Sequence, residues 1–151
     1  MIGFVQRVRE ASVTVGGERV GEIGPGIAVL VGAVAGDRPR EASRLAERLV
    51  GYRIFPDEAG RMNRSVLEVG GGVLLVPQFT LAADTRKGMR PSFAKAADPA
   101  VARRLFDDLV AVVRRSEPAG GVACGRFGAD MQVALVNDGP VTFWLDVPPP
   151  V

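Results

Sequence analysis

The first third of the chain alternates apolar and polar residues and predicts a run of strands. Ile2–Val8 and Ala11–Val15 alternate in this way and are rich in β-branched residues. Glu18–Ile23 follows after a Gly-Gly turn signal, which favours a hairpin. Ile27–Val34 is a continuous apolar run, as expected of a fully buried strand. Because these strands precede any helix, a simple alternation of strands and helices is excluded.

Two later segments have the period of an amphipathic helix. The first is introduced by Asp37, a predicted N-cap, and by Pro39 in the first turn. Its apolar positions recur at helical spacing and are Ala42, Leu45, Ala46 and Leu49. Asp98 and Pro99 repeat the cap-and-proline signal before the second helix. The apolar face of that helix consists of Ala102, Leu105, Phe106, Leu109, Val112 and Val113.

Further strands are predicted from short apolar runs at Tyr52–Phe55, Val73–Gln78, Gln132–Val136 and Val141–Val147. The segment between the last two, Asn137–Pro140, has the residues of a hairpin turn. Together these elements indicate an α/β protein with mixed, strongly curved, barrel-like β-sheets and two helices packed on them. We expect one domain over residues 1–147 and a frayed, proline-rich tail over residues 148–151.

The composition excludes most conventional catalytic sites. The 151 residues include no histidine and a single cysteine, Cys124. Ser-His-Asp triads, Cys-His pairs, HExxH zinc sites and internal disulfides are therefore impossible. We interpret Cys124 as a buried, unreactive thiol, with a nucleophilic role as the alternative. The lone cysteine, the absence of a secretory leader and the lack of an apolar run of about 18 residues indicate a cytoplasmic protein without a membrane span.

The chain carries a mild basic excess, with a formal net charge of +2. One segment, residues 86 to 95, holds cations and no acid, at Arg86, Lys87, Arg90 and Lys95. As a solvated loop this segment needs no further explanation, but it could also hold a phosphate backbone. The residue pattern alone does not distinguish these two interpretations.

Two segments carry candidate chemistry. Gln78 and Thr80 flank a phenylalanine at the end of a buried strand, and Thr80 could stabilise a developing oxyanion with its hydroxyl or its backbone N–H. The alternative is a threonine that only caps the strand end. In Asn137–Thr142, Gly139 permits unusual φ values and Pro140 permits a cis peptide bond. Because only about one X-Pro bond in twenty is cis, the residues alone favour an ordinary turn.

Both segments resemble signature motifs of the D-aminoacyl-tRNA deacylase family. Gln78–Asp84 is similar to the first motif and Asn137–Thr142 to the second, and the resemblance extends over nearly the whole chain as far as Val147. It includes the stretches Gln6–Val8, Ala11–Val15, Gly51–Phe55 and Gly88–Phe93. One position departs from the pattern, because the family usually has serine where this chain has Pro77. Proline removes both a hydroxyl and a backbone N–H.

The resemblance implies an enzyme of translation quality control. Such an enzyme hydrolyses the ester between a D-amino acid, or mischarged glycine, and the 3′-terminal adenosine of tRNA, and it rejects L-aminoacyl-tRNA. The resemblance also implies the family's α/β fold, a homodimer, and no metal or organic cofactor. The Gly139–Pro140 bond is expected to be cis and to enter the partner subunit's pocket.

The resemblance also implies roles for individual residues. Those expected to be catalytic are Gln78, Phe79 and Thr80. Those expected to bind the substrate and select its chirality are Arg7, Asn137, Gly139, Pro140, Val141 and Thr142. Those expected to bind tRNA are Arg86, Lys87, Arg90 and Lys95.

The expected mechanism needs no activated nucleophile from the protein, which agrees with the absence of histidine. Main-chain N–H groups would stabilise the oxyanion, and a hydroxyl of the RNA would help to activate water. Two alternatives stay open. One is a non-catalytic tRNA-binding module of the same fold, and the other is a hydrolase of small esters that uses a threonine or cysteine nucleophile.

Overall fold

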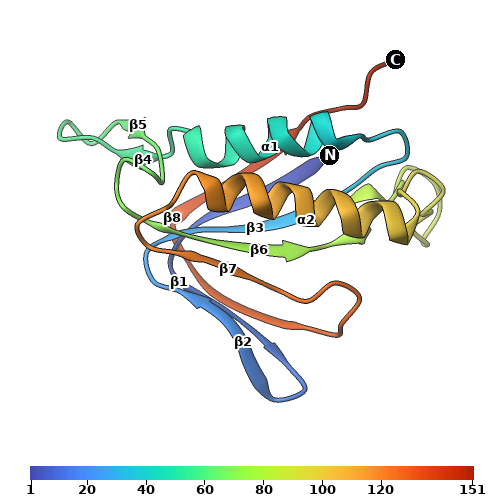
Figure 1. Ribbon diagram of the computed structural model, residues 1–151, viewed down its shortest axis with the longest axis horizontal. Helices are drawn as coiled ribbons and strands as arrows, with labels where there is room; N and C mark the ends of the chain where they lie inside the picture. The colour runs from blue at the N-terminus through green and yellow to red at the C-terminus, as the bar shows by residue number, and fades with distance from the viewer.

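Strand β1 (Ile2–Val15) organises the sheet because it pairs along both of its edges. On one edge its first half lies antiparallel to β3 (Gly26–Gly32) and its second half antiparallel to β2 (Glu18–Ile23). On the other edge β8 (Gln132–Asp146) runs antiparallel to nearly its whole length. This computed structural model describes all 151 residues, and its sheet bends strongly along β1 (Figure 1).

Two crossovers extend the sheet with parallel strands. The chain passes from β3 through α1 (Pro39–Gly51) to β6 (Gly72–Pro77), and from β6 through α2 (Pro99–Arg115) to β7 (Val122–Cys124). β6 lies parallel to β3, and β7 lies parallel to β6. The two helices pack side by side across one face of the sheet (Figure 1). The long connections around each helix are what allow these strands to run in the same direction.

The sheet curls until its two ends approach one another. β2 and β7 are in contact, and a Cβ placed on Gly21 of β2 would lie 3.1 Å from the carbonyl oxygen of Cys124 in β7. The sheet is therefore nearly closed. The predicted α/β class, with a strongly curved, barrel-like sheet and two helices, is confirmed.

The apolar residues form two cores, one on each face of the curved sheet. The larger core lies between the sheet and the helices and contains Leu45 of α1 and Leu109 of α2. The smaller core is enclosed by the curl of the sheet and contains Val13 of β1. Within β6, Leu74 belongs to the smaller core and its neighbour Leu75 to the larger one. Burial on both faces explains why β6 is a continuous apolar run.

The predicted start of α2 is correct and that of α1 is off by one residue. Asp98 caps α2, and its carboxylate accepts a hydrogen bond from the N–H of Ala100 at 3.0 Å. α1 is capped by Arg38 instead of Asp37, and the carboxylate of Glu41 accepts a hydrogen bond from the Arg38 N–H at 2.8 Å. The acidic side chain that satisfies the first turn of α1 therefore lies inside the helix and not before it.

Asp37 does not cap the helix; its carboxylate is fully buried and binds other groups. One oxygen accepts a hydrogen bond from the N-terminal ammonium of Met1 at 2.9 Å, and the other accepts from the N–H of Val34 at 2.7 Å. A buried charge needs partners of this kind, so the pair joins the start of β1 to the connection between β3 and α1.

In two places, a single strand takes the place of two strands that were predicted separately. Ile2–Val8 and Ala11–Val15 form one strand, β1, with a register irregularity where the prediction placed a break. Asn137–Pro140 is not a hairpin turn, because it lies inside β8 and the residues on both of its sides pair antiparallel with β1. A hairpin there would reverse the chain and remove half of that pairing.

The small elements were the least predictable. In place of a strand over Tyr52–Phe55, β4 spans Phe55–Pro56 and pairs with β5 (Met62–Arg64). β7 is too short to show a period, and it was not predicted. Neither helix combines the length and the apolar character of a membrane-spanning segment. The residues after Asp146 belong to no helix or strand.

Candidate active site

The first motif lies where β6 ends. Gln78 leaves the sheet with its backbone N–H still bonded to the carbonyl oxygen of Val31 at 2.7 Å, and Phe79–Ala82 forms the short 3₁₀ helix η1. The side-chain amide of Gln78 donates a hydrogen bond to the hydroxyl oxygen of Thr80. The first N–H groups of a helix have no partner within it. In η1 these groups belong to Phe79 and Thr80.

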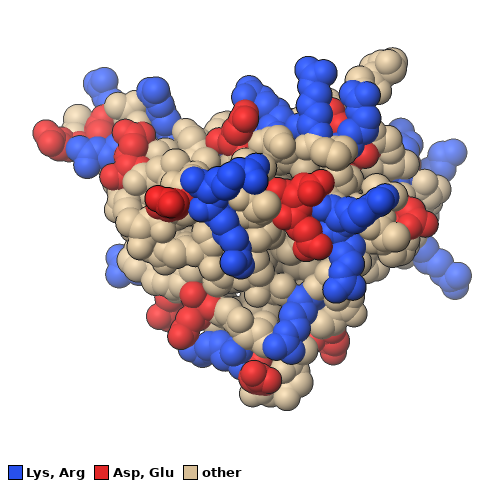
Figure 2. Space-filling model, viewed as in Figure 1, with Lys and Arg blue, Asp and Glu red and all other residues tan.

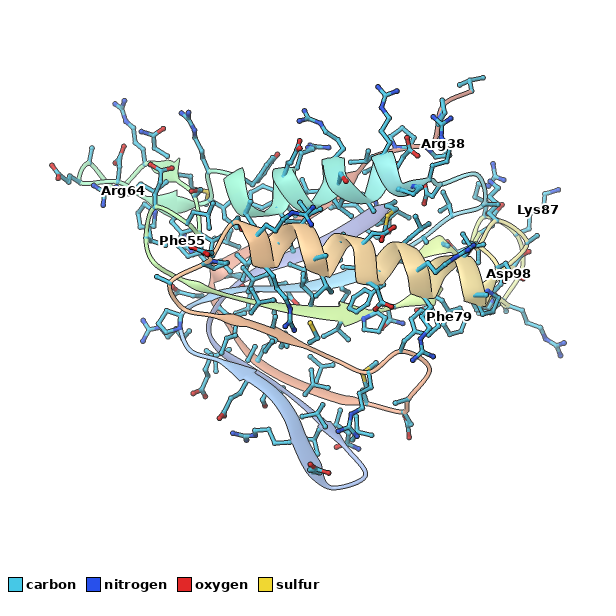
Figure 3. The ribbon with its side chains drawn as sticks, in the orientation of Figure 1. Arg38, Phe55, Arg64, Phe79, Lys87 and Asp98 are labelled. Carbon is cyan, nitrogen blue, oxygen red and sulfur yellow. The ribbon has the colours of Figure 1, made fainter.

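An apolar hollow of about 540 Å³ opens beside this motif. The ring of Phe79 is 58% exposed and lies against Phe93, with the ring centroids 5.2 Å apart. Phe127 lines the hollow as well, and Figure 3 shows Phe79 close to Asp98 at the N-terminal end of α2. Pro77, at the position where the family usually has serine, contributes its ring to the wall. We call this space the aromatic hollow; its size and its three rings suit a flat aromatic group.

The second motif is a protrusion within β8 that Asn137 holds in shape. The side-chain oxygen of Asn137 accepts a hydrogen bond from the N–H of Val141 at 3.0 Å, and its amide donates to the hydroxyl of Thr142 at 2.8 Å. Gly139 and Pro140 between them are exposed, and the bond that joins them is cis, as predicted. Gly139 has a φ of 137°, and a Cβ there would lie 2.6 Å from a side-chain carbon of Val141. This position therefore requires glycine.

Arg7 supports the same protrusion from the neighbouring strand. Its side chain is largely buried and lies with its guanidinium 6.0 Å from the centre of the Phe55 ring. Nε donates a hydrogen bond to the carbonyl oxygen of Asp138 at 3.0 Å, and Nη1 donates to that of Ile54 at 2.8 Å. The planar guanidinium thus ties β8 to the segment before β4 and fixes the backbone next to Gly139.

The two motifs do not meet within one chain. Arg7, beside the second motif, pairs with Ile27 of β3, whereas Gln78 bonds to Val31 of the same strand. These levels are about 13 Å apart along β3. β8 is also separated from β6 by β1 and β3, which adds about 14 Å across the sheet. The predicted catalytic and chirality-selecting residues are therefore about 20 Å apart in the chain.

The basic loop, residues 86–95, is organised by Asp84. The carboxylate of Asp84 accepts two hydrogen bonds from the guanidinium of Arg86 and lies 3.4 Å from Nζ of Lys95. Its backbone exchanges two hydrogen bonds with that of Ser92. The Arg86 hydrogen bonds, above all, hold the pKa of the Asp84 carboxyl well below its ordinary value.

Of the four basic residues predicted to bind tRNA, two form an ion pair within the chain and two do not. Arg86 and Lys95 pair with Asp84, whereas Lys87 and Arg90 form no ion pair. Figure 3 shows Lys87 on the loop beyond Phe79. The structural role of Asp84 was not predicted, although it is the nearest acid before the four cations.

Cys124 lies away from both motifs, on β7. Burial raises the pKa of its thiol, although Nη2 of Arg114 lies 3.8 Å from the sulfur. A thiol with a raised pKa is protonated at neutral pH and is a poor nucleophile. The raised pKa agrees with an unreactive thiol, but the prediction that Cys124 is buried is wrong, because the residue is half-buried.

Phe93 and Phe127 join the site although no local signal in the sequence points to them. Phe93 comes from the basic loop that follows η1, and Phe127 comes from the turn after β7 and reaches Phe79 because β6 and β7 are adjacent strands. Such a meeting depends on the strand order, which a single sequence does not reveal.

Two solved structures have a similar fold. A structure titled as a c-Myc DNA unwinding element binding protein superposes with a TM-score of 0.92 at 38% identity and covers 98% of this chain and 99% of its own. A structure of a probable eukaryotic D-amino acid tRNA deacylase superposes with a TM-score of 0.83 at 18% identity, covering 97% and 98% of the two chains. The second likeness concerns the fold alone.

The sequence comparisons are closer. This chain is 62% identical over 150 residues to the D-aminoacyl-tRNA deacylase of Thioalkalivibrio sulfidiphilus, with 99% of each chain covered. It is 63% identical over 150 residues to the protein of the same name from Methylococcus capsulatus, with 99% of this chain and 96% of the relative covered. Residues 4–146 match the family profile described as D-Tyr-tRNA(Tyr) deacylase. As its two motifs predict, the chain belongs to the D-Tyr-tRNA(Tyr) deacylase family.

Proposed function

We propose that this chain hydrolyses the ester between a D-amino acid, or glycine, and the 3′-terminal adenosine of tRNA. The observation that carries the proposal is the first motif, where Phe79 lines the aromatic hollow and begins the short helix η1, with Thr80 next to it. A site of this kind can hold a nucleoside and stabilise an oxyanion next to it. It offers no activated nucleophile, which limits its chemistry to substrates that are already reactive.

The ester of an aminoacyl-tRNA is such a substrate. Water adds to the carbonyl carbon, the bond from that carbon to the 3′ oxygen breaks, and this oxygen leaves with a proton. The N–H groups of Phe79 and Thr80 would stabilise the negative charge on the carbonyl oxygen during this step. The free 2′-hydroxyl of the adenosine is suited to help activate the water. The protein's contribution is then position and electrostatics.

The aromatic hollow is suited to the adenine base. Phe79, Phe93 and Phe127 offer ring faces and edges, and stacking of a base on an aromatic side chain contributes about 1–3 kcal/mol. Pro77 adds apolar surface in place of the family's usual serine. Adenine in this hollow would bring the ester next to η1.

A homodimer completes the site. The protrusion at Gly139 and Pro140 is too far from Thr80 in one chain, so we place it in the pocket of the partner subunit. β8 supports this arrangement because its outer edge is unpaired and its exposed apolar side chains include Val133, Val136 and Trp144. An exposed strand edge with apolar side chains favours association with a second chain.

Selection for the D form is then steric and made by the main chain. A pocket that accepts every D side chain cannot recognise the side chain itself, but a wall at the α-carbon can exclude the L arrangement. Gly139 and Pro140, held by Asn137 and Arg7, are suited to form that wall. Glycine has no side chain to exclude and should be a substrate.

The acceptor end of tRNA would approach over the basic loop. Lys87 and Arg90 are free to contact phosphates, while Arg86 and Lys95 shape the loop through Asp84. A protein that acts on charged tRNA belongs in the cytoplasm. No metal ion or organic cofactor enters this mechanism.

The proposal is tested by incubating the protein with D-Tyr-tRNA, with L-Tyr-tRNA and with a small D-tyrosine ester. Release of tyrosine from the D-form tRNA alone is the expected result. Binding of both tRNAs without release would instead show a non-catalytic tRNA-binding module. Rapid cleavage of the small ester without RNA would show a conventional esterase.

A further inference from the structure

A second hollow begins where the aromatic hollow ends. It has a volume of about 580 Å³ and lies between α2 and the segment Cys124–Ala129. Phe127 and Gly128 line both spaces, so the two are adjacent. Three arginines line the second hollow, which we call the arginine groove: Arg103, Arg114 and Arg126.

The positive charge of this groove is not neutralised within the chain. None of its three arginines forms an ion pair, whereas arginines elsewhere, such as Arg19 and Arg44, pair with a nearby glutamate. Asp107 is the one acid that lines the groove. Figure 2 shows the face that carries α2, with basic side chains on the helix and on the surface below it.

The three side chains are exposed, and two of them have a neighbour inside the groove. The guanidinium of Arg103 lies 5.8 Å from the centre of the Phe127 ring, at the junction of the two hollows. Nη2 of Arg114 has only the sulfur of Cys124 at 3.8 Å as a partner, and all three residues are exposed. Arginine binds phosphate through two N–H groups at once and also stacks on bases.

We propose that the arginine groove binds the single-stranded nucleotides that precede the terminal adenosine of tRNA. This inference rests on the proposed function, because that adenosine occupies the adjoining aromatic hollow. Arg103 and Arg114 are about 16 Å apart along α2, which is more than one nucleotide requires. The groove therefore follows a strand and does not hold a single anion. The unpaired bases keep their faces free for Phe127 and the guanidinium groups.

The chain supplies a matched control. Arg104 and Arg115 follow two of the groove arginines on the same helix and point to other faces, since neighbouring helical residues differ in direction by about 100°. Arg104 lines a different hollow, between α1 and α2, and Arg40 lies on the exposed side of α1. All three are exposed and form no ion pair. The control variant carries alanine at Arg40, Arg104 and Arg115.

The test compares the groove variant, with alanine at Arg103, Arg114 and Arg126, with the control variant. Binding of two uncharged RNA hairpins is measured over a range of salt concentrations; one has the single-stranded 3′ end of tRNA and the other is blunt. The wild type is expected to prefer the tailed hairpin. The groove variant should lose at least tenfold in affinity for it, and its salt slope should fall by about 0.7 for each lost phosphate contact. The control variant should retain the preference for the tail.

Equal losses in both variants, or a groove variant that still prefers the tailed hairpin, would overturn the inference. Equal thermal midpoints of the three proteins show that folding is not the cause of a loss. Because the hairpins carry no amino acid, the result does not depend on turnover. Failure to hydrolyse D-Tyr-tRNA would contradict the proposed function. The binding comparison would still show whether the arginine groove binds the single-stranded 3′ end.

Discussion

Thr80 illustrates how much a residue's surroundings change its chemistry. Its hydroxyl oxygen accepts a hydrogen bond from the Gln78 amide, and the chain has no histidine to remove its proton. The residue type alone left a nucleophile, an oxyanion donor and a simple strand cap open. The start of η1 favours the backbone N–H as the group that matters.

We therefore predict that Thr80→Val and Thr80→Ala reduce single-turnover hydrolysis of D-Tyr-tRNA by less than about tenfold. This small loss reflects weaker positioning of η1, because the backbone N–H donor of Thr80 remains in both variants. Loss of an oxyanion donor itself would reduce the rate by about 10²–10³. Circular dichroism and gel filtration serve as controls for folding and assembly. A loss of several orders of magnitude in a folded protein would make the hydroxyl essential.

Asp84 is predicted to act as the clamp of the basic loop. Asp84→Asn weakens the contacts to Arg86 and Lys95, so trypsin at pH 8 should cleave after Arg86 and Lys87 faster than in the wild type. Asp130→Asn, an exposed aspartate without a partner, is the control. Equal cleavage rates in all three proteins would contradict the clamp.

The clamp also has a predictable pH dependence. Because the hydrogen bonds from Arg86 depress the pKa of the Asp84 carboxyl, the clamp is at full strength above the ordinary pKa of aspartate. It is lost only as the pH falls through the depressed value of the folded protein. The exchange protection of the Ser92 N–H should therefore be unchanged between pH 5 and pH 8. A loss of protection within that range would show that another group controls the loop.

At the scale of elements, the helices were predictable and β8 was not. Helical periods and caps are local features, so the apolar residues spaced around Leu45 and Leu109 are enough to predict the buried face of each helix. Gly139 and Pro140 are a local turn signal, but their segment is kept within one strand by its pairing with β1, more than 120 residues away. The two short strands β4 and β7 likewise depend on their neighbours.

The α2 face also gives a stability prediction. Leu109 is fully buried between the helices and the sheet, and Leu109→Ala should reduce the free energy of unfolding by about 2–5 kcal/mol through lost contacts and a cavity. Arg104→Ala on the exposed side should change it by less than about 0.5 kcal/mol. Urea unfolding at one protein concentration measures both. Similar values for the two variants would mean that α2 does not close the core.

At the scale of the whole molecule, the two motifs lie apart, and we propose that a second copy of the chain brings them together. The strand order puts the two motifs on different parts of the sheet. The sequence shows both motifs, but it does not show how far apart they lie in the fold. We predict that the protein sediments with twice the chain mass of 15.9 kDa. Hydrolysis per chain should fall on dilution in step with dissociation of the dimer. Full activity in a monomer would contradict a shared site.

We propose that the main chain at Gly139 and Pro140 excludes the L form by contact at the α-carbon. This exclusion is tested most directly by single-turnover rates on D-aminoacyl-, glycyl- and L-aminoacyl-tRNA with the wild-type protein. The D-aminoacyl and glycyl substrates should be hydrolysed, and the L form should not. Glycyl-tRNA that resists as completely as L-aminoacyl-tRNA would contradict the proposal, because recognition would then require a contact to the D side chain.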